Sequence, residues 1–190
     1  DPVTDPRLFA AARAEHMTGV IRPALDDGTW VISDRFMASN RVYPGKADGT
    51  VSERIAYAIT RSVIEPATHV ADLHCGDGNE SLRPYSYWQV SGDDALDRQS
   101  KEMALAFGLD HIVVDRDRPQ DPARSAYTSN TAITRGKPAI TAESGGMGLT
   151  DEASVAAQEA GALSLVRHLG IQADAPSVKV TQAVWYDRSE

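Results

Sequence analysis

The chain has 190 residues, which is enough for one well-packed domain and too few for two of ordinary size. Hydrophobic residues make up 42% of it and charged residues 24%, the composition of an ordinary globular protein. The formal net charge of −8 argues against a nucleic-acid partner, and no apolar run approaches the length needed to span a bilayer. The single cysteine, Cys75, excludes a disulfide within the chain and leaves the compartment open.

The first part of the chain contains one predicted helix and one predicted strand. Apolar residues recur at helical spacing over residues 8–21, and Pro23 ends that helix. A turn at residues 26–28 leads into a short strand at residues 29–32. An irregular loop at residues 40–49 follows it.

A helix and a buried strand come next, and they form the centre of the predicted fold. Thr50 and Glu53 have the spacing of a capping box, in which each side chain accepts a hydrogen bond from the other residue's backbone amide. The helix that they open extends to about residue 64, and Pro66 ends it. Residues 70–75 then predict a buried strand that delivers polar groups into a glycine-rich turn, as strands do at the sites of open α/β sheets. This order of elements predicts an α/β layered domain.

Several elements follow the central strand. The alternating aromatic residues at 84–90 predict a strand, and a helix capped by Asp93 or Asp94 is expected to run through Phe107 and end at Gly108. Residues 111–114 predict a buried strand. The polar residues 115–137 are expected to form a long loop, of the kind that binds ligands or is partly disordered.

The last part of the chain predicts a strand, the longest helix and a further strand. The strand at residues 138–143 ends in a glycine-rich turn. Thr150 is expected to cap the helix, and Gly170 follows its end. Residues 177–186 alternate between apolar and polar side chains, which predicts the final strand.

Two residues of the central strand are candidates for chemistry. Asp72 and His74 share one face of it, because side chains alternate along a strand. A histidine at the end of such a strand, with a carboxylate two residues before it, is a candidate metal ligand with a supporting carboxylate. The alternative is a histidine that only hydrogen-bonds its neighbours.

Glu143 is the second candidate. It closes a predicted buried strand, where a carboxylate is costly unless it is paired, bound to a metal or used as an acid or base. A salt-bridged glutamate under a turn is the alternative. Arg41 and Arg135 can each bind a carboxylate through the forked guanidinium, or they can be solvated loop arginines.

Four short stretches carry these polar residues in a particular order. They read Asn-Arg-Val-Tyr-Pro-Gly at residues 40–45, Ser-Glu-Arg-Ile-Ala at 52–56, Asp-Leu-His at 72–74 and Thr-Ala-Glu-Ser-Gly-Gly at 141–146. Together they resemble the succinylglutamate desuccinylase/aspartoacylase family, whose members are zinc-dependent amidohydrolases related to the zinc carboxypeptidases. The resemblance implies a phosphorylase/hydrolase-like α/β fold, in which helices flank a mixed central sheet.

The resemblance also implies roles for individual residues. His74 corresponds to a zinc ligand of the family, and Glu143 corresponds to the glutamate that activates the zinc-bound water and then protonates the leaving amine. Asn40 and Arg41 correspond to a pair that orients the substrate, with Arg41 on its carboxylate. Arg135, eight residues before Glu143, is similar to another substrate-binding arginine.

The chain departs from the family pattern upstream of the central strand. The family's other two zinc ligands come from an H-x-x-E motif, and this chain contains no such motif. His69 and Asp72 have a similar spacing, but on a strand they would lie on opposite faces. Because one histidine does not make a catalytic zinc site, we expect the remaining ligands to belong to residues that are absent here.

The expected organisation is a catalytic-type α/β domain over residues 1–172, without its amino-terminal part, and the start of a truncated β segment over residues 173–190. The leading hypothesis is zinc-dependent hydrolysis of the amide bond of an N-acyl amino acid or similar small carboxylate. A carboxypeptidase-like peptidase and a metal-free binding domain that keeps the fold are the alternatives, and an α/β domain without an active site is the plainest interpretation. The acyl group, the amine and the oligomeric state are left open.

Overall fold

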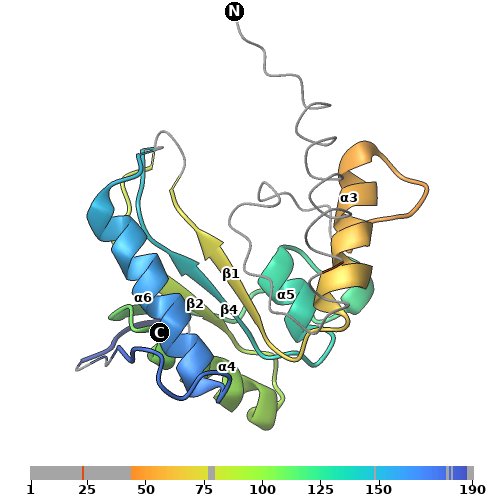
Figure 1. Ribbon diagram of the computed structural model, residues 1–190. Coiled ribbons are helices and arrows are strands. Elements are labelled where there is room, and N and C mark those ends of the chain that lie inside the picture. Colours follow the sequence, from red (N-terminus) through yellow and green to blue (C-terminus); the bar gives the residue numbers. More distant parts are fainter. Residues whose placement is uncertain are drawn as a thin grey trace, which may run out of the picture.

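A mixed sheet flanked by helices forms the fold (Figure 1), as the sequence predicts. The computed structural model describes Pro23 and residues 44–76, 80–147, 149–178, 180 and 182–187. The helix predicted at residues 8–21 and the strand predicted at residues 29–32 lie outside these residues.

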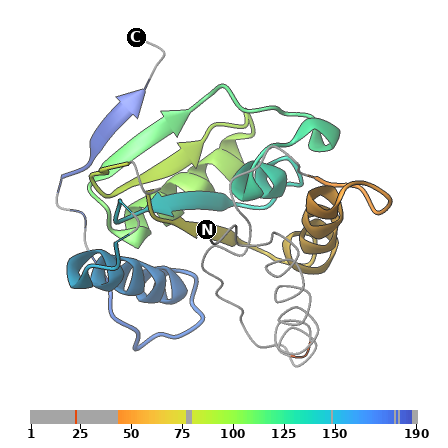
Figure 2. The ribbon, with the colours of Figure 1, turned by 90° about the horizontal axis from the view of Figure 1, so that it is seen from above.

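Five strands make up the described sheet, in the order β1-β4-β2-β3-β5 (Figure 2). They are β1 (Val70–His74), β2 (Tyr85–Gln89), β3 (His111–Asp115), β4 (Ala139–Glu143) and β5 (Val184–Asp187). All neighbouring strands are parallel except β2 and β4, which are antiparallel. The strands predicted within the described residues are confirmed, except that the last one is only four residues long and not the ten of residues 177–186. It pairs with β3, so it belongs to the same sheet.

The three longest described helices begin where a side-chain oxygen accepts hydrogen bonds from free backbone amides. The helices are α3 (Val51–Ile59), continued by a π-helix at Thr60–Ile64, then α4 (Asp94–Phe107), α5 (Thr128–Ile133) and α6 (Glu152–His168). The capping box before α3 is confirmed, because the Thr50 side chain accepts a hydrogen bond from the Glu53 amide and Glu53 Oε2 accepts one from the Thr50 amide. None of the described helices is long and apolar enough to cross a membrane.

Two expectations about the second half of the chain are wrong. Residues 115–137 do not form one long loop, since they contain a 3-10 turn at Pro122–Arg124 and helix α5. The cap of α6 is Asp151, whose side chain accepts a hydrogen bond from the Ser154 amide at 2.9 Å, and not Thr150. A carboxylate at this position also interacts favourably with the positive end of the helix.

The sheet has one face packed against helices and one face that carries polar and aromatic side chains. Helices α4 and α6 cover the first face and form its core with apolar residues of the strands, namely Met103, Ala104, Phe107, Leu109, Ile112, Ile140, Ala142 and Leu165. Helices α3 and α5 form a second apolar cluster beside β1 and β4, with Ala56, Ile59, Ile64, Ala132, Ile133 and Ala139. Much of the second face is therefore left for a site.

The crossing of α6 over α4 depends on a glycine. A Cβ atom added to Gly161 would lie only 2.4 Å from Cε1 of the Phe107 ring, which is too close for two carbon atoms. Phe107 is only 1% exposed, so its ring has little room to move away. We predict that Gly161→Ala lowers the free energy of unfolding by about 1–3 kcal/mol through overpacking, although alanine normally favours a helix over glycine by about 1 kcal/mol. Urea denaturation measures this change, with Glu159→Ala on the exposed side of α6 as the control. A higher unfolding midpoint for Gly161→Ala would contradict the packing argument.

Candidate active site

The parallel pairing of β1 and β4 brings the sequence-predicted residues together. His74 is paired with Glu143, and Asp72 is paired with Thr141, so these side chains project from the same face of the sheet. His74 Nε2 lies 3.1 Å from Asp72 Oδ2, and His74 Nδ1 lies 3.9 Å from Glu143 Oε1. Because the His74, Asp72 and Glu143 side chains are 14–23% exposed, the cluster is partly shielded from water.

The glycines after β4 allow the turns beyond β1 and β4 to approach each other. The Gly76 amide donates to the Gly145 carbonyl at 3.0 Å, and the Met147 amide donates to the Glu80 carbonyl at 2.8 Å. Gly145 has a φ of +92°, and a Cβ on Gly146 would lie 2.4 Å from the Glu80 oxygen. This pair of glycines thus allows a close approach of backbone to backbone beside Glu143.

A small cavity of about 180 Å³ lies over the cluster. Besides Asp72, His74 and Glu143, the side chains that line it include Tyr87, Gln89, Asp115, Arg118, Tyr127 and Thr141. Tyr87 and Gln89 come from β2 and Asp115 from the end of β3, whereas Arg118 and Tyr127 come from the connection between β3 and α5. The cavity is therefore built from segments that are far apart in the sequence.

Charged groups dominate the lining of this cavity. Burial lowers the pKa of Arg118, but hydrogen bonds and charge interactions with Asp115 and Tyr127 together outweigh burial and raise the pKa, so the guanidinium stays charged. Arg118 also lies over the ring of Tyr127, with Cζ 4.2 Å from the centroid. Formally, one guanidinium faces the three carboxylates of Asp72, Asp115 and Glu143. The cavity is thus suited to ligands that carry a positive charge or a neutral polar group.

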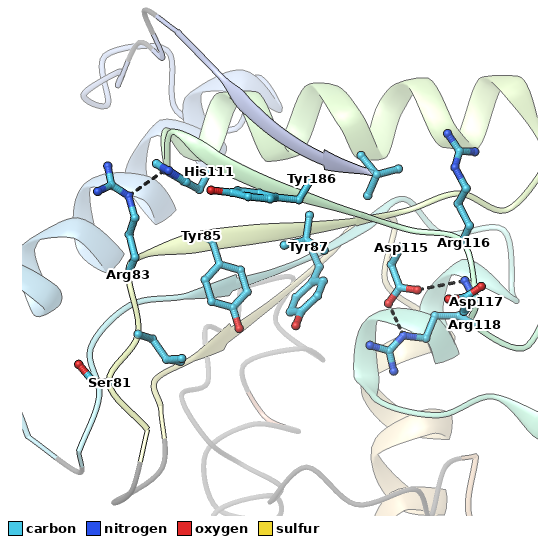
Figure 3. Close-up of a pocket in the computed structure, with 13 residues that line it drawn as sticks. Ser81, Arg83, Tyr85, Tyr87, His111, Asp115, Arg116, Asp117, Arg118 and Tyr186 are labelled. Carbon is cyan, nitrogen blue, oxygen red and sulfur yellow. Dashed lines mark hydrogen bonds and ion pairs between the residues drawn. The ribbon is translucent and has the colours of Figure 1, made fainter. Parts of the chain in front are cut away.

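A larger cavity of about 700 Å³ adjoins the small one and shares Tyr87, Asp115 and Arg118 with it. Figure 3 shows the rings of Tyr85 and Tyr87 side by side on the same face of β2, in an edge-to-face arrangement with centroids 5.2 Å apart. Burial raises the pKa of Tyr85, and so does a hydrogen bond with Tyr87, so this phenol stays neutral near pH 7.

The basic residues around the larger cavity have acidic partners. Arg83 forms an ion pair with Asp110 at 3.1 Å, and Arg116 forms one with Asp187 at 2.7 Å. His111, stacked on Tyr186, contacts Asp110 as well. The larger cavity therefore offers a ligand aromatic surface more than unpaired positive charge.

The structure places Arg135 away from the cavity. Its Nε lies 3.8 Å from Glu65 Oε1, and its Nη1 donates to the Thr131 carbonyl at 3.0 Å. Its role in substrate binding stays a prediction, which this ion pair does not support. Asn40 and Arg41 lie outside the described residues.

The sequence reasoning missed Gln89, Asp115 and Arg118. The alternation of β2 places Tyr85, Tyr87 and Gln89 on one face, and this pattern is visible in the sequence. What the sequence does not give is that β2 lies beside β4 and that its side chains therefore share a face with Glu143.

The described residues do not complete a zinc site. Among them, no group of three or more His, Cys, Asp and Glu side chains is placed to hold a metal ion. A catalytic zinc site needs three protein ligands, and an imidazole beside two carboxylates is a chemically suitable part of one. His74 therefore fits one ligand position, and the rest of such a site would have to come from elsewhere.

Solved structures of similar fold are proteins of the succinylglutamate desuccinylase/aspartoacylase family. The succinylglutamate desuccinylase/aspartoacylase protein from Rhodobacter sphaeroides is 28% identical, with a TM-score of 0.62 over 81% of this chain and 44% of that one. The chain is similar in fold and sequence to proteins of the succinylglutamate desuccinylase/aspartoacylase family. The product-bound ectoine utilization protein EutE (DoeB) from Ruegeria pomeroyi is 25% identical, with a TM-score of 0.67 over 88% of this chain and 49% of that one.

Sequence comparisons match both this family and a second one. The N-alpha-acetyl-L-2,4-diaminobutyric acid deacetylase of Halomonas elongata is 32% identical over 133 residues, which are 70% of this chain and 37% of the deacetylase. The thymidylate kinase family model matches residues 1–75, and the thymidylate kinase of Marinomonas is 40% identical over 101 residues, 52% of this chain and 45% of the kinase. The kinase matches are partial and unrelated to the desuccinylase/aspartoacylase fold. The chain spans about half the length of these relatives or less.

The wall of the small cavity depends on a buried asparagine. Asn130, 1% exposed, accepts a hydrogen bond from the Ala126 amide at 2.7 Å and donates to Gln89 Oε1 at 3.1 Å and to the Pro119 carbonyl at 2.9 Å. We predict that Asn130→Ala lowers the free energy of unfolding by about 1–3 kcal/mol, because buried partners lose their hydrogen bonds.

Urea denaturation measures this loss when the free energy of unfolding falls with urea concentration at the same slope in the wild type and the variant. Arg124→Ala, at an exposed position of the same connection, is the control and should change stability by less than about 0.5 kcal/mol. Equal effects of the two variants would show that Asn130 does not hold the connection in place.

Proposed function

We propose that this domain hydrolyses the amide bond of an N-acyl amino acid, as a deacylase of the succinylglutamate desuccinylase/aspartoacylase family. The observation that carries the proposal is the placement of Glu143 opposite His74, at the ends of adjacent strands and over one small cavity. The fold of the solved relatives and the similarity to a deacetylase support it.

Glu143 would move the proton in this reaction. As a general base it takes a proton from the water whose oxygen forms a bond to the amide carbon. The same carboxyl group then gives that proton to the leaving nitrogen as the carbon–nitrogen bond breaks, so that a carboxylate and an amine are released. Asp72 fixes the orientation of the His74 ring through the 3.1 Å contact. Asn40 and Arg41 would orient the substrate, with Arg41 on its carboxylate.

Zinc is the cofactor that we propose for the complete site. His74 would be one ligand, and the remaining ligands would come from outside the described residues. A zinc ion in such a site lowers the pKa of a bound water toward neutrality and polarises the amide carbonyl.

The substrate that we propose is an N-acylated amino acid with a second, cationic amine. N-alpha-acetyl-L-2,4-diaminobutyrate, from which the Halomonas deacetylase takes its name, is of this kind. The excess of carboxylates over guanidinium groups in the small cavity supports a cationic group on the ligand.

One observation favours a second candidate. The described residues supply one imidazole to the small cavity and no complete set of metal ligands. A metal-free domain that binds the same ligand without hydrolysing it would have this composition, and metal analysis separates the two.

We predict that the chain contains about one zinc ion after purification and that His74→Ala loses most of it. Elemental analysis of the wild type, of His74→Ala and of the control His168→Ala measures this. His168 lies at the exposed end of α6. Almost no zinc in the wild type would favour the metal-free binding domain.

We predict that Glu143→Gln lowers kcat for N-alpha-acetyl-L-2,4-diaminobutyrate by a factor of about 10² to 10⁴, because the amide cannot accept the proton of the water. The amine released from the wild type and the variant is measured at equal zinc content. Glu159→Gln removes an exposed carboxylate of α6 and should leave kcat unchanged. A zinc-loaded wild type that leaves every N-acyl amino acid intact would contradict the proposed function.

A further inference from the structure

Gln89 has an unusual position at the edge of the small cavity. It is the last residue of β2, lines the cavity together with Glu143 and Asp115, and is only 5% exposed. Its Oε1 accepts a hydrogen bond from Asn130 Nδ2 at 3.1 Å. Its Nε2 has no hydrogen-bond partner among the described residues.

The orientation of the Gln89 amide follows from its neighbours. A backbone amide is always a donor, so the Ala126 amide fixes the oxygen of Asn130 at the 2.7 Å contact. The other end of the Asn130 amide is then its nitrogen, which donates to Gln89 and to the Pro119 carbonyl. Gln89 must therefore present its oxygen to Asn130, and its two N–H groups point elsewhere.

A buried amide nitrogen without an acceptor is costly, and native proteins rarely leave one. Gln89 Nε2 belongs to a residue that lines the same cavity as Glu143. Its missing hydrogen bond is explained if a ligand in this cavity supplies the acceptor. The formal charge of the lining decides which acceptor this is. Three carboxylates against one guanidinium disfavour an anionic group, whereas a neutral carbonyl oxygen is compatible with them.

We propose that Gln89 is a substrate-binding residue whose Nε2 donates a hydrogen bond to the acyl carbonyl oxygen of the substrate. This inference rests on the proposed function, because it assigns the acyl end of the substrate to the β2 side of the cavity. Besides anchoring the connection after β3, Asn130 then holds the Gln89 amide in the orientation that leaves Nε2 available to the substrate. Gln89 selects for the acylated amine over the free amine, which has no such oxygen.

The test compares two probes in the Glu143→Gln background, which binds without turnover. The probes are N-alpha-acetyl-L-2,4-diaminobutyrate and 2,4-diaminobutyrate, and calorimetry gives the ratio of their dissociation constants. We expect Gln89→Met to reduce the preference for the acetylated probe by about 3- to 10-fold, the range for one neutral hydrogen bond.

A purely structural role for Gln89 predicts a different pattern. Gln89→Met would then weaken both probes by the same factor. This result, or a parent that does not prefer the acetylated probe, would overturn the role of Gln89. The hydrolysis assay with wild-type protein would still test the proposed function. A parent that binds neither probe, together with a wild type that hydrolyses neither this nor any other N-acyl amino acid, would overturn both.

Discussion

The pairing of β1 with β4 determines both the core and the candidate site. In the register of these two parallel strands, His74 lies opposite Glu143 and Leu73 lies opposite Ala142. A slip by one residue would turn the polar pair into the core and the apolar pair out of it. Burial of Leu73 and Ala142 under α4 and α6 therefore fixes where the imidazole and the carboxylate meet. The geometry of the site is a consequence of packing on the opposite face of the sheet.

The remaining walls of the cavity depend on polar contacts. Strand β2 runs antiparallel to β4 and adds Tyr87 and Gln89 to the face of Glu143. The connection after β3 is anchored on this face by Asn130, which contacts Gln89 and two backbone groups. Since hydrogen bonds require particular partners and angles, this wall has a defined shape without an apolar core of its own. An acidic cavity with one guanidinium, Arg118, is the result.

The sequence predicted the parts of the fold that local patterns specify, and it missed those that depend on distant partners. The strands were found because their residues alternate or are continuously apolar, and α3 was found because Thr50 and Glu53 form its cap. Helix α5 was missed because it has only six residues, and buried polar groups such as Asn130 and Thr131 hold it in place. Asp72, His74 and Glu143 were found from their positions at strand ends and from the family resemblance. Gln89 and Arg118 were missed because their places in the cavity depend on which strands are neighbours.

The thymidylate kinase family model matches residues 1–75, a segment that includes β1. Strand β1, however, pairs along its whole length with β4, which lies outside that segment. Its side chains belong to the core under α4 and α6 and to the site with Glu143, so β1 is part of the desuccinylase-like sheet. Because no H-x-x-E motif occurs in the chain, the segment before β1 does not carry the family's usual zinc ligands. Apolar clusters hold the described helices on the sheet, and the contact with Asp72 orients the His74 ring. Packing and this one contact therefore position the imidazole beside Glu143.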